Sequence, residues 1–211
     1  MNTPSAPFDP KLHWESIYGR KGPQEVSWFQ PMPKVSLQLF EQYDVPKDAR
    51  IIDVGGGDSQ LVDHLLDRGF TDITVLDISG TALRKAQERL GPRGEDVHWI
   101  EADATQFTAP VLYDVWHDRA VFHFLTSDQA VDDYLLRMGD YLKPGGLLIL
   151  ATFSESGPEN CSGIPVHRYS ETEMIARLQM ICERVKCFTV DHVTPFNTTQ
   201  NFLFCAFHKK P

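Results

Sequence analysis

The chain has 211 residues, and its 20 Lys and Arg against 29 Asp and Glu give a formal net charge of −9. Hydrophobic residues make up 42% and charged residues 23%, a balance that favours a globular domain over a disordered chain. The acidic balance argues against binding to duplex DNA or to an anionic membrane, because either partner requires a basic face. No apolar run approaches the ~20 residues that span a membrane. We expect a cytoplasmic protein, monomeric or homodimeric, that binds neither nucleic acid nor a membrane.

The first 49 residues predict a helical arm ahead of the core, which we place at residues 50–211. Asp9 and Pro10 are typical of a helix start, and this helix should run to Tyr18. A polar and aromatic stretch then leads to a second helix at about 34–43. Such an arm can close over a ligand as a lid.

From residue 50 onward, short apolar runs alternate with amphipathic stretches. Strands are predicted at residues 51–54, 73–76, 97–100, 113–116, 147–153, 184–192 and 201–208. Helices are predicted from the cap Ser59 to Gly69, from Ser79 to Leu90, over 128–142, and from the capping box Ser170/Glu173 through the stripe Ile175, Leu178, Ile181 and Cys182. This alternation implies a parallel sheet with helices on both faces. The last two strands should pair as an antiparallel hairpin at the sheet edge.

A glycine-rich loop closes the first strand of the core, in the sequence Asp53-Val54-Gly55-Gly56-Gly57. A dinucleotide site requires G-x-G-x-x-G, but Gln60 occupies the third glycine position. The carboxylates of Asp53 and Asp58 would also repel a pyrophosphate. A nicotinamide-dependent oxidoreductase is therefore disfavoured. A cationic ligand without phosphate, such as S-adenosylmethionine (SAM), suits the loop better.

Two more acids follow the next two strands. Asp77 ends the second strand, where a carboxylate can accept both ribose hydroxyls, and Asp103 follows the third, where it can accept the amino group of an adenine. We assign their neighbours Ile78 and Ala104 to the same site. Because the carboxyl ends of parallel strands meet at one edge, these acids and the glycine loop together predict SAM binding, and we expect no metal.

Residues 51–153 resemble the core of class I SAM-dependent methyltransferases. The resemblance rests on the glycine loop at 53–57, on Asp77 and Asp103, and on the turn Leu142-Lys143-Pro144-Gly145-Gly146. It implies a Rossmann-like sheet of seven strands, mostly parallel, with an antiparallel last strand. It also implies methyl transfer from SAM, with S-adenosylhomocysteine (SAH) as product.

The flanks resemble a bacterial branch of small methyltransferases. The motifs are His13-Trp14-Glu15 with Tyr18, Val26-Ser27-Trp28-Phe29-Gln30, and residues 116–125, whose Asp118-Arg119 pair also resembles thiopurine and thiol methyltransferases. We favour a small-molecule acceptor, with sulfur or nitrogen receiving the methyl group. A protein lysine is the alternative acceptor, and a SAM-binding module without turnover is the alternative to an enzyme.

His117, Asp118 and Arg119 follow the fourth strand, where the methyl group should lie, and are the catalytic candidates. His117 can contact the cofactor or orient the acceptor, whereas Asp118 and Arg119 either steer the acceptor or form a structural ion pair. His123 is a weaker candidate for a base. Methyl transfer is an in-line displacement that depends mainly on alignment, so even a base is dispensable for a thiol.

Aromatic and charged residues outside these motifs complete the predicted site. Tyr18 and Trp28 can contact the sulfonium of the cofactor through cation–π attraction, whereas we assign Trp14 to packing. Arg168 and Tyr169, in the connection over 154–169, are candidates for binding an anionic or aromatic acceptor.

The four cysteines are Cys161, Cys182, Cys187 and Cys205. No two form a CxxC pair, and no histidine cluster lies beside them at the spacing of zinc ligands. We predict buried thiols in a reducing compartment.

Overall fold

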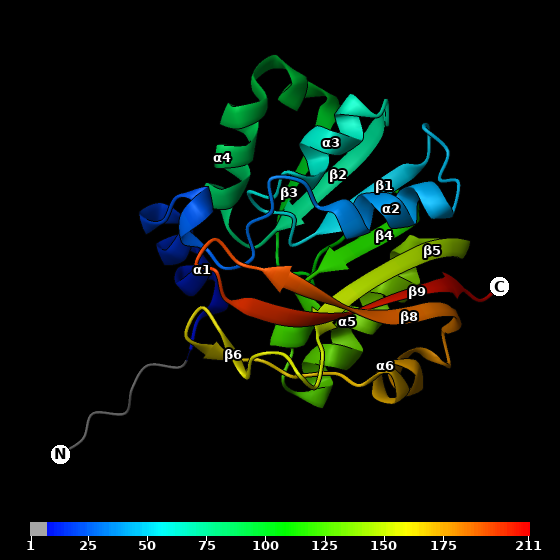
Figure 1. The fold of residues 1–211 in the computed structure, drawn as a ribbon. Helices are drawn as coiled ribbons and strands as arrows, with labels where there is room; N and C mark the ends of the chain where they lie inside the picture. The colour runs from blue at the N-terminus through cyan, green and yellow to red at the C-terminus, as the bar shows by residue number, and fades with distance from the viewer. Residues whose placement is uncertain (1–7) are drawn as a thin grey trace.

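A seven-stranded sheet runs through the centre of the protein (Figure 1). The computed structural model describes residues 8–211, and the strand order is β3-β2-β1-β4-β5-β9-β8. These strands are β1 (Arg50–Val54), β2 (Asp72–Asp77), β3 (Val97–Glu101), β4 (Tyr113–Arg119), β5 (Leu142–Phe153), β8 (Cys182–Val193) and β9 (Thr199–Lys209). The five strands from β3 to β5 are parallel, and β9 is antiparallel to both β5 and β8. The predicted Rossmann-like sheet, its antiparallel last strand and the edge hairpin are confirmed.

Helices cover both faces of the sheet (Figure 1). They are α1 (Pro10–Arg20), α2 (Lys34–Gln42), α3 (Leu61–Asp67), α4 (Gly80–Leu90), α5 (Asp128–Tyr141) and α6 (Glu171–Leu178), with short 3-10 turns at Pro23–Glu25, Gly91–Asp96 and Phe122–Phe124. One buried apolar cluster packs under α2, α3 and α4, and the other under α5 and α6. Strand β5 supplies both, because Ile149 faces the first cluster and Leu150 the second. No helix within residues 8–211 is long and apolar enough to cross a membrane.

Side-chain caps set most helix starts as predicted. Asp9, Ser79 and Ser170 accept hydrogen bonds from the main chain of α1, α4 and α6. Two details differ. Gln60, not Ser59, precedes the first residue of α3. Helix α6 ends at Leu178, so the predicted stripe breaks before Ile181, and Cys182 instead begins β8.

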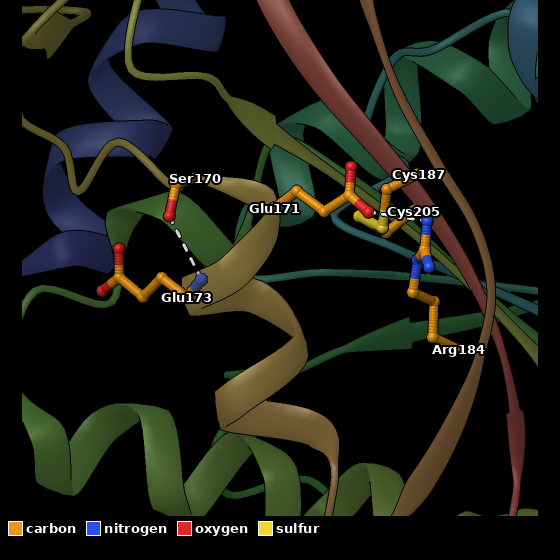
Figure 2. The surroundings of a disulfide bond; sticks show 6 residues. All are labelled: Ser170, Glu171, Glu173, Arg184, Cys187 and Cys205. Carbon is orange, nitrogen blue, oxygen red and sulfur yellow. Dashed lines mark hydrogen bonds and ion pairs between the residues drawn. A yellow bond between two sulfur atoms is a disulfide. The ribbon is translucent and has the colours of Figure 1, made fainter.

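Only one of the two hydrogen bonds of the capping box predicted for α6 is present. The hydroxyl of Ser170 accepts from the main-chain N–H of Glu173, but the carboxylate of Glu173 lies 2.7 Å from Nε2 of His167 (Figure 2 shows the Ser170 bond). A small hairpin that the sequence did not predict, β6 (Asn160–Cys161) with β7 (Ile164–Pro165), lies in the connection between β5 and α6. Figure 1 shows β6 at the same edge of the sheet as α1.

Two of the four predicted thiols are joined. Cys187 of β8 and Cys205 of β9 lie directly opposite each other and form a disulfide beside the Arg184–Glu171 ion pair that ties β8 to α6 (Figure 2). The expectation of buried thiols is wrong for this pair, because the hairpin register brings together cysteines that are 18 residues apart. Cys161 and Cys182 are free and buried, as predicted.

Candidate functional site

A cavity of about 640 Å³ opens at the carboxyl edge of the sheet. The chain leaves β1 for β2 and β3 and returns to β4 on the other side of β1, so the connections diverge there and leave space for a ligand. Because β9 is antiparallel, its amino end reaches the same edge. Eight predicted site residues line the cavity: Tyr18, Trp28, Gly55, Asp77, Ile78, Asp103, Ala104 and Arg119.

The glycine loop passes so close to its neighbours that side chains would not fit. Gly55 has φ +68°, and a Cβ there would lie 1.9 Å from Cγ2 of Val121. Gly57 has φ +45°, and its Cβ would lie 2.8 Å from Oδ2 of Asp77. The N–H of Gly55 donates to the carbonyl of Leu76 at 2.7 Å, which ties the loop to β2. The loop therefore forms a rigid part of the cavity wall, and a ligand can approach its main chain closely.

Asp77 offers a hydrogen-bond acceptor at this wall. Its Oδ1 accepts from the main-chain N–H of Ser79 at 2.8 Å, while Oδ2 is the oxygen that faces Gly57. Burial, together with the nearby carboxylates of Asp53 and Glu15, raises the pKa of Asp77 to about 7. Within residues 8–211 no hydrogen bond reaches Oδ2, so this oxygen can accept from a bound hydroxyl.

Asp103 lies at the end of the cavity nearest β3. Its Oδ1 accepts from the N–H and the hydroxyl of Thr105, at 2.8 and 2.7 Å. These two bonds fix the carboxylate in the cavity wall, and its second oxygen, which has no hydrogen bond within residues 8–211, can accept from a ligand.

His117 lies behind the site rather than in its wall. It is 2% exposed, with Nδ1 2.7 Å from Oδ1 of Asp53 and Nε2 2.8 Å from Oγ of Ser36. Both ring nitrogens are therefore occupied, and the ring connects β4 to β1 and α2. This placement does not fit the prediction that His117 contacts the cofactor or orients the acceptor, and it makes His117 a positioning residue for Asp53. Asp53, itself 3% exposed, supports the loop from behind.

Asp118 supports the turn after β4. Tyr134 donates to its Oδ2 at 2.6 Å, and the N–H of Val121 donates to its Oδ1 at 2.9 Å. Burial raises the pKa of Asp118 to about 6. These bonds hold Ala120 at φ +79° and press Val121 toward Gly55. The predicted ion pair with Arg119 does not form, because consecutive strand residues point to opposite faces of the sheet.

Arg119 points into the cavity. Its Nη1 donates to the carbonyl of Trp28 at 3.1 Å, and its guanidinium lies 5.0 Å from the ring centroid of Phe202. Its Nη2 is buried without a hydrogen-bond partner among the described residues. Burial lowers the pKa of Arg119 to about 10, so it remains a cation at neutral pH.

The predicted base His123 is neutral and occupied. Its Nδ1 accepts from the N–H of Phe153 at 3.1 Å, so the proton lies on Nε2. Burial and the positive charge of Arg119 lower its pKa to about 3. It packs between Phe124 and Phe153, at 4.6 and 4.5 Å between ring centroids, behind these two cavity-lining residues. A ring in this state cannot take up a proton from an acceptor.

Arg168 and Tyr169 brace the connection over residues 154–169. Arg168 donates to the carbonyl of Glu155 and to the carboxylate of Glu159, both at 3.0 Å. Tyr169 is 1% exposed and packs against Phe122, at 5.3 Å between centroids. Their positions do not fit the predicted acceptor contacts, because these bonds and this packing hold them in the loop itself.

Several lining residues were not predicted: Phe8, Trp14, Phe124, Phe153, Cys161, Ile164, Pro165, Gln200 and Phe202. Trp14, which we assigned to packing, lines the cavity and also packs against two aromatic rings. Its ring centroid lies 5.7 Å from that of Trp28 and 5.1 Å from that of Phe124. Phe202 and Phe153 are register partners on β9 and β5. Only strand pairing could reveal that register, so no local sequence signal marked Phe202 or Gln200.

Comparison with known proteins agrees with this arrangement. Residues 52–148 match the family described as a methyltransferase domain. The chain is similar to the eEF1A lysine and N-terminal methyltransferase of Mus musculus, with 24% identity over 159 residues, or 72% of this chain and 22% of that protein. It therefore spans about a fifth of the length of that curated relative.

Two solved structures share the fold. The N-methyltransferase NodS from Bradyrhizobium japonicum, in complex with SAH, has a TM-score of 0.73 and 17% identity, covering 96% of this chain and 100% of that one. The 1,6-didemethyltoxoflavin-N1-methyltransferase from Burkholderia thailandensis, with 1,6-didemethyltoxoflavin and SAH bound, has a TM-score of 0.70 and 17% identity, covering 100% and 94%. The thiopurine-like branch is not among these similarities. Residues 52–148 match a methyltransferase domain, and both solved structures share the fold of this chain.

The first prediction concerns the close contact between Gly55 of the glycine loop and Val121. Gly55→Ala should abolish SAH binding in calorimetry, because the new methyl group clashes with Val121 and displaces the loop. Gly69→Ala is the matched control: Gly69 also has a positive φ (+82°) but nothing within 4 Å of its Cβ position. The control should lose only about 1–2 kcal/mol of stability, the cost of left-handed backbone, and keep its affinity. Equal affinity in both variants would contradict the tight fit.

The second prediction concerns Asp77 and pH. Below its pKa, Asp77 binds a proton in the free protein and loses the charge that accepts ribose hydroxyls. SAH affinity should therefore fall as the pH drops from about 8 to about 6, by linkage between proton and ligand binding. Asp77→Asn should bind more weakly and lose this pH dependence. Asp67→Asn, at an exposed ion pair with Arg93, should keep the wild-type profile. An unchanged profile in Asp77→Asn would remove Asp77 from the site.

Proposed function

We propose that the protein transfers a methyl group from SAM to a small molecule that enters the cavity, with sulfur or nitrogen as the acceptor atom. The observation that supports this most is the continuity of the cavity. One space connects Asp77 and Asp103, at β2 and β3, with Arg119, Phe153 and Phe202, at β4, β5 and β9. Cofactor and acceptor can therefore lie end to end in it.

The lining fits SAM at the end near β2 and β3. Gly55 lets the loop pack closely against Val121, Oδ2 of Asp77 has no hydrogen bond within residues 8–211 and can accept from ribose hydroxyls, and Asp103 can accept from the adenine amino group. Tyr18 and Trp28 supply aromatic surface for a positive charge. SAM supplies a methyl group already activated by its sulfonium.

The rest of the chain orients the reactants and excludes water. The carbonyl of Tyr18 accepts from Lys85 of α4 at 2.6 Å, and Trp28 is held by Arg119, so the arm is fixed over the cavity. The hairpin β6–β7 covers another side through Cys161 and Ile164. A volume of about 640 Å³ falls within the roughly 300–1,000 Å³ typical of small-molecule sites.

A protein lysine is the second candidate acceptor, and the names of the curated relatives favour it. A lysine side chain would enter from the surface and would have to lose its proton. The location of Arg119 disfavours it, because a cation in the cavity wall repels an ammonium group.

The third prediction separates these functions. Purified protein with SAM is incubated with thiols, with nitrogen heterocycles, or with lysine-containing peptides, and SAH is measured over time. We expect SAH release with a member of the first two sets and none with the peptides. Release with the peptides alone would support the second candidate. SAH binding without turnover in any set would identify a module that binds SAM without catalysis.

A further inference from the structure

We propose that the acceptor is a flat molecule that binds as an anion, with its negative atom on Arg119 and a hydrogen-bond donor on Gln200. This inference rests on the proposed function and assigns the substrate class of the same cavity.

Arg119 forms no ion pair within residues 8–211, and the only carboxylate that favours its charge across a distance is that of Asp53 behind the glycine loop. Its guanidinium donates to the carbonyl of Trp28 and lies against the aromatic ring of Phe202. Nη2 is buried and has no hydrogen-bond partner among the described residues. Arg119 is partly buried, and a cation with a buried, unpartnered nitrogen is stabilised when an anion accompanies it. A bound anion would complete the site.

Gln200 is a second polar group without a partner in the same wall. It is 8% exposed, and its Oε1 is buried without a hydrogen bond among residues 8–211. It stands two residues before Phe202 on β9, so both side chains lie on one face of the strand. An acceptor that lies along the ring of Phe202 can therefore reach Arg119 and Gln200 together.

The cavity has opposite charges at its two ends. Its described acidic residues, Asp77 and Asp103, lie at β2 and β3, whereas Arg119 leans over β9 on the far side of β4. Aromatic rings, including those of Phe124 and Phe153, line the part of the cavity near Arg119, where we place the acceptor. This distribution favours a cationic ligand at one end and a flat anion at the other.

An anionic acceptor also requires no base, and the two candidates near the acceptor end, His123 and Cys161, cannot act as one. His123 is neutral with Nδ1 already bonded, and burial raises the pKa of the Cys161 thiol to about 11, so neither takes a proton at neutral pH. A lone pair on the anion forms the new bond to the methyl carbon while the carbon–sulfur bond of SAM breaks with its electrons onto sulfur. Anion and sulfonium become two neutral products, and no proton has to move.

The carboxylate of SAM is the other anion that Arg119 could bind. Val54 of β1 pairs with Asp118 of β4, so the next residues in each strand direction, Gly55 and Arg119, lie near each other. Its guanidinium leans toward Phe202 on β9, however, whereas the glycine loop is bonded to β2 on the other side. The geometry therefore favours the acceptor, and binding measurements can separate the two.

The test measures binding rather than turnover. Thiophenolate and benzoate are the flat anions, and thioanisole and benzamide are their neutral counterparts. Each is titrated by calorimetry, in mildly alkaline buffer, into wild-type protein saturated with SAH. We expect each anion to bind at least about tenfold more tightly than its neutral counterpart, the difference that one charge-assisted hydrogen bond provides.

Variants then locate the cause. Arg119→Gln should remove the preference for anions and change SAH affinity less than about threefold. Gln200 is tested with 4-aminobenzoate, whose amino group can donate to Oε1: Gln200→Leu should remove any gain in affinity of 4-aminobenzoate over benzoate without changing SAH affinity. Arg20→Gln removes an exposed charge on α1 and should behave as wild type. Far-ultraviolet circular dichroism checks that each variant is folded. The comparison of anions with neutral counterparts uses wild-type protein, so it does not depend on the folding of any variant.

Three results would overturn the inference. In the first, neither anion is preferred by the wild-type protein, while SAH still binds. In the second, Arg119→Gln loses SAH affinity and keeps its preference for anions, which would assign Arg119 to the cofactor. In the third, Arg20→Gln loses the preference as fully as Arg119→Gln. Absence of SAH binding by the wild-type protein would instead contradict the proposed function.

Discussion

The contact between Gly55 and Val121 is the constraint on which the site depends. It exists because Gly55 has no side chain and adopts a positive φ, and because the turn after β4 is held rigidly from below. Trp116 donates to the hydroxyl of Tyr134 at 2.8 Å, Tyr134 donates to Asp118, and Asp118 accepts from the N–H of Val121. A network of buried polar groups on the α5 face of the sheet thus positions the turn that borders the cavity at the carboxyl edge.

The same strand alternation separates structure from chemistry along β4. Asp118 points to the face of α5 and supports the turn, while His117 and Arg119 point to the opposite face. Of these two, His117 is enclosed by Asp53 and Ser36, and Arg119 alone extends to the cavity. Three consecutive residues that look like one catalytic motif therefore have three different tasks, of which one is open to a ligand.

Sequence reasoning predicted Gly55, Asp77 and Asp103, which line the cavity, but missed the lining residues that β9 contributes, for a physical reason. Gly55, Asp77 and Asp103 each follow a strand, so counting strands placed them at one edge. Gln200 and Phe202 reach that edge only through the antiparallel register of β9 with β5, which local patterns do not encode. The disulfide of Cys187 was missed for the same reason. The predicted roles of Arg168 and Tyr169 relied on their loop alone, whereas their partners fix them within it.

The division into an arm over residues 1–49 and a core over 50–211, the oligomeric state, the compartment and the absence of a metal stay predictions. The most direct test of the whole account is a crystal structure of the protein grown with SAH. The account predicts ribose hydroxyls on Oδ2 of Asp77, the adenine beside Asp103, and open space between the sulfur atom and Arg119. SAH elsewhere on the protein, or in the cavity with its ribose away from Asp77, would contradict it.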